Sequence, residues 1–222
     1  FEGHQHQQAW NELLVRTAGD ALADDLVGLR DRLGHAQLWE LLSAALIVAQ
    51  DKKSRYPEPL KAFWEAFKIA IVEGAEVGYS EKAEYRSPSD LLLPRKTLSE
   101  QEIAAFHQIG GELISETLRP HRNAAIQLGV KELTLERFVA IANESLALPN
   151  AGDNKATPDQ LESLFQPLWA IGEELLPGTE SPSSAVQQSV RQLKRLPFVL
   201  GTDLGVASID QCYRPPVGKT GD

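Results

Sequence analysis

The chain has no methionine among its 222 residues and a single cysteine, Cys212. An intact translation product contains methionine, so we expect a processed or trimmed protein. One cysteine excludes an intrachain disulfide and every Cys-x-x-Cys redox or zinc motif. This cysteine usage fits a reducing compartment, and a cytoplasmic location is our expectation.

Long apolar runs and an excess of positive charge are also missing. The longest strongly apolar run, residues 41–49, falls well short of the roughly 20 residues that span a bilayer, and the first ten residues show no secretory signal. The formal net charge is −9, which disfavours nucleic acid as a partner because such binding depends on Lys and Arg neutralising phosphates. A nucleic-acid surface built from the basic residues in 52–55 and 191–195 is a minor alternative. We therefore expect neither a membrane segment nor a nucleic-acid partner.

Recognisable catalytic and metal-binding motifs are absent from the sequence. The Gly-Lys-Thr triplet at 218–220 lacks the glycine five residues earlier and the following helix that a phosphate-binding loop needs. His4 and His6 have no third ligand nearby. Glu102 and His107 are five residues apart, whereas a helical di-metal site uses Glu-x-x-His pairs. The sequence thus predicts no metal site, and it selects no cofactor.

Helical periodicity is the main positive signal. Ser99 and Glu102 form a capping box, and apolar residues then recur at helical spacing, which predicts a helix over 99–118 that Pro120 ends. Gly110 and Gly111 in mid-helix indicate close packing or a weak point. Further helices are predicted over 5–17, 20–33, 36–50, 60–71, 121–128, 134–148, 158–175 and 182–195. Gly34 and Gly129 are expected to close two of these helices. Thr157 and Gln160 are expected to form a second capping box, and Pro167 should kink the helix that follows.

The order and spacing of these helices predict an all-α fold. We expect a helical bundle of about eight to nine helices, with a long mid-chain connector at 74–96 and an irregular C-terminal tail from Pro197. A single all-α domain over residues 1–222 is expected, with a possible subdivision near 149–157, where turn-forming residues gather.

One cluster of cations stands out in this acidic chain, directly after the predicted central helix. Arg119, His121 and Arg122 either form a solvated helix end, where cations complement the macrodipole, or grip a carboxylate or phosphate. In the second interpretation, Trp64, Phe106 and His107 supply the wall of an apolar pocket. The aromatic stripe that contains Trp64 is equally typical of a core.

Two functions from different classes follow from these observations. The first is a non-enzymatic helical interaction module that binds a protein partner or forms a homo-oligomer, because helices 36–50 and 60–71 carry more apolar surface than a simple bundle needs. The second is an all-α small-molecule-binding protein or enzyme for a small anionic ligand. It would use the six pocket residues Trp64, Phe106, His107, Arg119, His121 and Arg122, with His107 or His121 as the acid–base group.

Overall fold

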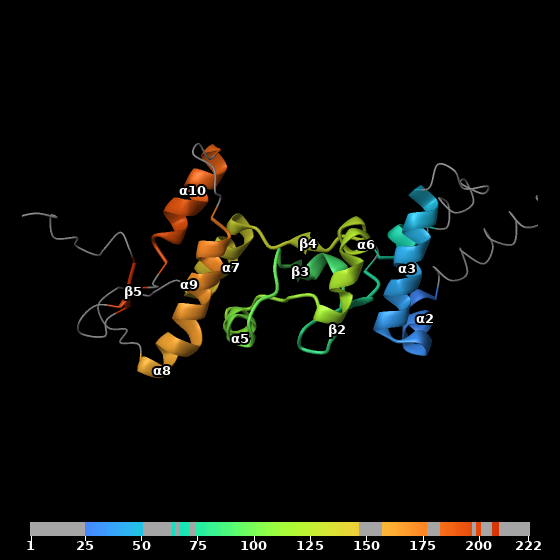
Figure 1. Ribbon diagram of the computed structural model, residues 1–222, viewed down its shortest axis with the longest axis horizontal. Coiled ribbons are helices and arrows are strands. Elements are labelled where there is room, and N and C mark those ends of the chain that lie inside the picture. Colours follow the sequence, from blue (N-terminus) through green and yellow to red (C-terminus); the bar gives the residue numbers. More distant parts are fainter. Residues whose placement is uncertain are drawn as a thin grey trace, which may run out of the picture. The chain divides into compact units, whose positions relative to one another are not determined.

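A computed structural model of the chain describes residues 25–50, 64, 67–71, 74–146, 157–176, 183–196, 199–200 and 206–208 (Figure 1). These residues form eight α-helices with short 3-10, π and β segments, so the all-α prediction is confirmed. The helix predicted over 5–17 and the start of the next one lie outside the described residues.

The chain divides into two compact units. Unit 1 comprises residues 1–93 and 112–132, and unit 2 comprises residues 94–111 and 133–222. The subdivision expected near 149–157 falls almost wholly outside the described residues. The single domain and this subdivision both stay predictions.

Unit 1 begins with two consecutive helices that lie side by side (Figure 1). Helix α2 (Leu26–Leu33) has Asp25 as its N-cap, with the carboxylate accepting from the Gly28 amide at 3.1 Å, and it ends at Gly34 (φ 78°). Helix α3 (His35–Gln50) follows at once. One face of α3 is buried in the core of unit 1. It shares this core with residues of α2 and α6 and with Phe67. The described contributors to that face of α3 are Leu38, Trp39, Leu42, Ala45 and Leu46.

Short extended segments pair beside these helices in unit 1. Strands β1 (Gly78–Tyr79) and β2 (Tyr85–Arg86) form an antiparallel hairpin, and β3 (Leu92–Leu93) pairs in parallel with β4 (Lys131–Glu132). Two isolated bridges, Ser80 to Ile114 and Leu92 to Leu113, connect the two pairs. The resulting order of neighbouring segments is β2, β1, 113–114, β3 and β4. Ten of the 23 residues in the connector predicted at 74–96 therefore lie in paired segments or in the 3-10 helix η1 (Pro88–Asp90).

Unit 1 ends with the 3-10 helix η2 (Glu116–His121) and helix α6 (Arg122–Gln127). The short helix predicted over 121–128 is confirmed, and the glycine expected to close it, Gly129, has a φ of 103°.

The predicted central helix is correct at its start and wrong at its end. Helix α5 (Glu100–Gln108) begins with the expected capping box: Glu102 N donates to Ser99 Oγ at 3.2 Å, and Ser99 N donates to the Glu102 carboxylate at 2.7 Å. The helix ends at Gln108, twelve residues before Pro120, because Gly110 takes a φ of 85°. Pro120 itself lies inside η2.

Unit 2 contains α5 and five later helical elements. These are helix α7 (Leu135–Leu146), helix α8 (Pro158–Gln160), the π-helix η3 (Leu161–Phe165), helix α9 (Gln166–Glu174) and helix α10 (Ser184–Leu193), followed by the antiparallel pair β5 (Val199–Leu200) and β6 (Val206–Ala207). Phe106 and Phe138 stack in the core of this unit with ring centroids 6.2 Å apart. Gly172 permits close packing, since a Cβ there would lie 3.0 Å from Leu193 Cδ1.

The interruption predicted at Pro167 takes the form of the π-helix that precedes it. Pro167 lies in the first turn of α9, where a missing amide hydrogen breaks no necessary bond. The wider π-helical turn avoids the clash that a proline ring makes with the carbonyl four residues earlier. The capping box predicted at the start of this segment is confirmed, with Gln160 N donating to Thr157 Oγ1 at 3.3 Å and Thr157 N donating to Gln160 Oε1 at 3.0 Å.

Candidate functional site

The six residues of the predicted pocket are divided between the two units. Unit 1 holds Trp64, Arg119, His121 and Arg122, whereas Phe106 and His107 belong to α5 of unit 2. Trp64 is buried in the same hydrophobic core as Leu118, the neighbour of Arg119. Phe106 is fully buried in the core of unit 2. The two aromatic residues are thus core residues of different units, and their role in a pocket stays a prediction.

Arg119 is the most enclosed of the three cations. Only 15% of its side chain is exposed, with Nη1 3.5 Å from Glu116 Oε1 and Nη2 3.8 Å from Glu81 Oε1. Its Nε and Nη2 atoms are buried and make no hydrogen bond within the described part of the chain, and the same holds for Glu81 Oε1. Two carboxylates therefore already offset the charge of Arg119, and an added anion would have to compete with Glu81.

His121 and Arg122 each have a partner that is distant in sequence. His121 Nδ1 lies 2.8 Å from the hydroxyl of Ser43 on α3, and Arg122 forms an ion pair with Glu132 at the end of β4. A hydroxyl beside an imidazole resembles a nucleophile with its base, but such a pair also needs a group that orients the imidazole. Among the described contacts of His121 no carboxylate provides this, so the geometry fits a structural link between α3 and η2.

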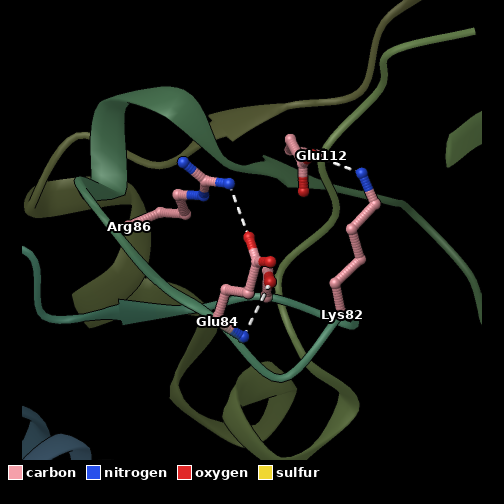
Figure 2. Close-up of polar contacts among 5 residues, drawn as sticks. Lys82, Glu84, Arg86 and Glu112 are labelled. Carbon is pink, nitrogen blue, oxygen red and sulfur yellow. Dashed lines mark hydrogen bonds and ion pairs between the residues drawn. The ribbon is translucent and has the colours of Figure 1, made fainter.

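The tip of the β1–β2 hairpin carries a second group of ion pairs. Figure 2 shows Lys82 reaching across to Glu112, with Nζ 2.5 Å from Oε1, while Arg86 pairs with Glu84 of the same hairpin at 2.5 Å. The Glu84 carboxylate raises the pKa of Arg86 through this hydrogen bond and its charge. The pairs hold the hairpin tip against residue 112, and Ala83 between them takes a φ of 61°.

Four side chains at the base of this hairpin stack on one another. The ring of His35 lies parallel to that of Tyr79 with centroids 3.8 Å apart, Tyr79 meets Tyr85 at 5.1 Å, and the guanidinium of Arg30 covers Tyr85 at 4.0 Å. We call Arg30, Tyr85, Tyr79 and His35 the hairpin stack. The stack joins the corner between α2 and α3 to the hairpin.

The chain has no detectable match among known proteins, and its described residues contain neither a metal-binding group nor a membrane-spanning helix. Neither a family model, nor a curated protein, nor a solved structure matches this chain. Within the described residues, no group of three or more His, Cys, Asp or Glu side chains is placed to hold a metal ion. None of the helices in the described ranges is long and apolar enough to cross a bilayer.

Sequence reasoning found the cations but missed their partners and the hairpin stack. Glu81, Glu132 and Ser43 lie between 10 and 78 residues away from the cations that they contact, and no local pattern links them. Tyr79 and Tyr85 face each other across the hairpin, but their loop lacks the Asn-Gly or Asp-Gly signal of a tight turn. Nothing in the sequence predicts that Ala83 adopts a left-handed backbone conformation.

Proposed function

We propose that this chain is a non-enzymatic helical interaction module that binds a protein partner or self-associates. The supporting observation is the exposure of two large apolar side chains in unit 1. Ile47 on α3 is 69% exposed and Ile69 is 58% exposed, although neighbouring residues of both segments belong to the core. Where exposed apolar side chains gather into one patch, the patch is typical of a surface that another protein covers. A cytoplasmic location, suggested by the single cysteine, belongs to this proposal.

The electrostatic contacts of unit 1 support the same function. Arg119 and Arg122 both face carboxylates of their own chain, so these cations contribute to internal cohesion. Residues available for recognition are then the exposed apolar ones together with the polar side of α3, where Gln37, Glu40 and Ala44 are also exposed. An apolar centre with a polar rim is the usual composition of a protein–protein interface.

Native mass spectrometry of the full chain tests the proposal, combined with substitution of the exposed residue. We expect a dimer or larger species, or a co-purifying protein, that Ile47→Lys removes. The matched control is Ile126→Lys, which places the same charge on α6 at a position that is 38% exposed. Both positions tolerate a lysine because its charge remains in water. A monomer that binds no protein, or a complex that Ile47→Lys leaves intact, would contradict the proposal.

The alternative function, binding of a small anionic ligand, has one supporting observation. The buried Nε–Nη2 edge of Arg119 has no hydrogen-bond acceptor in the described part of the chain, and this edge of a guanidinium pairs well with carboxylates. The same mass spectra distinguish the two functions. A monomer that carries extra mass, lost on denaturation and absent from Arg119→Gln, favours the ligand.

A further inference from the structure

The base of the β1–β2 hairpin is fastened to the α2–α3 corner by four side-chain contacts. Two are hydrogen bonds to the backbone just before β1: Arg30 Nη1 donates to the Glu76 carbonyl at 2.5 Å, and Trp39 Nε1 donates to the Val77 carbonyl at 2.8 Å. The other two are ring contacts of the hairpin stack, His35 on Tyr79 and Arg30 over Tyr85. His35 and Trp39 are one turn apart on α3. The first turns of this helix therefore contact both the residue before the hairpin, Val77, and its first strand at Tyr79.

His35 is the one member of this fastening that changes its charge near neutral pH. It is the first residue of α3, where the free amide groups of the helix make a cation unfavourable. On the α2 side, the nearest charges are Arg30 and its ion-pair partner Asp31. On the hairpin side, the stack presents the phenols of Tyr79 and Tyr85, and the Glu84–Arg86 pair lies next to Tyr85. In the described part of the chain, no carboxylate forms an ion pair with His35.

We propose that His35 makes the attachment of the β1–β2 hairpin sensitive to acid, so that protonation of its imidazole releases the hairpin from the α2–α3 corner. A charged imidazole would gain attraction to the face of Tyr79. It would also lose solvation, meet the amino end of α3, and add a second cation to a stack that already ends in Arg30. Three effects oppose protonation of the fastened state and one favours it.

The direction of the pH effect follows from proton linkage. Burial lowers the pKa of His35 below its ordinary value of 6.5 in the fastened state. When the hairpin is released, the imidazole regains water and its ordinary pKa. More than about one unit above pH 6.5 both states are neutral, and pH has no effect. As the pH falls from 6.5 towards the lowered pKa, only the released state binds the proton, so release is favoured by up to about tenfold per pH unit.

Hydrogen exchange of the full chain, followed by mass spectrometry, tests this proposal. The measured quantity is the exchange rate of peptides covering 76–87 relative to a peptide covering α6 in the same sample, which removes the intrinsic pH dependence of exchange. Between about pH 6.5 and about pH 5.5 we expect this ratio to rise by up to about fivefold, because the released imidazole is already half protonated at its ordinary pKa of 6.5. The range stays above the titration of ordinary carboxylates.

Three variants separate the role of His35 from general acid effects. His35→Phe keeps a flat ring on Tyr79 but cannot bind a proton, so the rise should disappear. His35→Gln removes the ring as well, and should give a higher ratio that does not change with pH. His121→Gln is the matched control in the same unit and should keep the wild-type rise. The proposal is overturned by a flat ratio in the wild type, or by a rise that persists in both His35 variants.

Discussion

Replacing Trp39 with Phe should weaken unit 1 by an amount that the structure allows us to calculate. Trp39 is fully buried, and its indole N–H donates to the Val77 carbonyl at 2.8 Å. Phe retains an aromatic ring but has no donor. Leaving a buried carbonyl unsatisfied costs about 1–3 kcal/mol. Loss of the remaining ring atoms adds roughly 1–2 kcal/mol through lost burial and a small cavity. We expect the free energy of unfolding to fall by about 2–5 kcal/mol.

Urea unfolding followed by far-ultraviolet circular dichroism measures this change without relying on tryptophan fluorescence. If the two units unfold in separate transitions, only the transition of unit 1 should move. Val27→Ala on α2 is the matched control, since Val27 is partly exposed and its truncation should change stability by less than about 0.5 kcal/mol. A loss below about 1 kcal/mol in Trp39→Phe would refute the hydrogen-bond argument.

Three further substitutions test backbone and capping geometry by the same unfolding assay. Ser99→Ala removes the acceptor for the Glu102 amide and should cost about 1 kcal/mol; an unchanged midpoint would mean that the capping box does not stabilise α5. Gly110→Ala places a Cβ on a residue with a φ of 85° and should cost about 1–2 kcal/mol; a stabilised protein would contradict the observed end of α5. Ala83→Gly should instead stabilise the hairpin by up to about 1 kcal/mol, because relief of the left-handed strain exceeds the entropy lost by glycine; destabilisation would argue against that conformation.

The parts of the fold that sequence reasoning predicts correctly are those with local causes. The capping boxes at Ser99 and Thr157, and the closing glycines Gly34 and Gly129, act within a few residues of themselves. The helix ends that such residues mark lie close to their predicted positions. A cap is satisfied by its own neighbours, and so it can be identified without knowing the rest of the structure.

The parts that sequence reasoning gets wrong depend on distant pairing. Leu113 and Ile114 continue the apolar spacing of α5, and this led to the prediction of one helix through residue 118. In the structure they bridge to Leu92 and Ser80 instead. Short apolar runs suit a buried strand as well as a buried helix, and the choice is made by partners elsewhere in the chain. Distant pairing also explains why the candidate site was predicted only in part. Arg119 and Arg122 could be identified from the sequence, whereas Glu81 and Glu132 become their partners only in the folded chain.

The two units are interleaved along the chain, which constrains how the protein is made and how it can be divided. The backbone passes from one unit to the other after residues 93, 111 and 132. No single cut therefore isolates either unit from the other, and a fragment ending at residue 93 would lack η2, α6 and β4. On the ribosome, unit 1 cannot be completed until residue 132 has emerged, by which time α5 of unit 2 has already left the tunnel. In most multidomain chains an amino-terminal domain is complete before any of the next domain is made, whereas here one helix of unit 2 is made before unit 1 is complete.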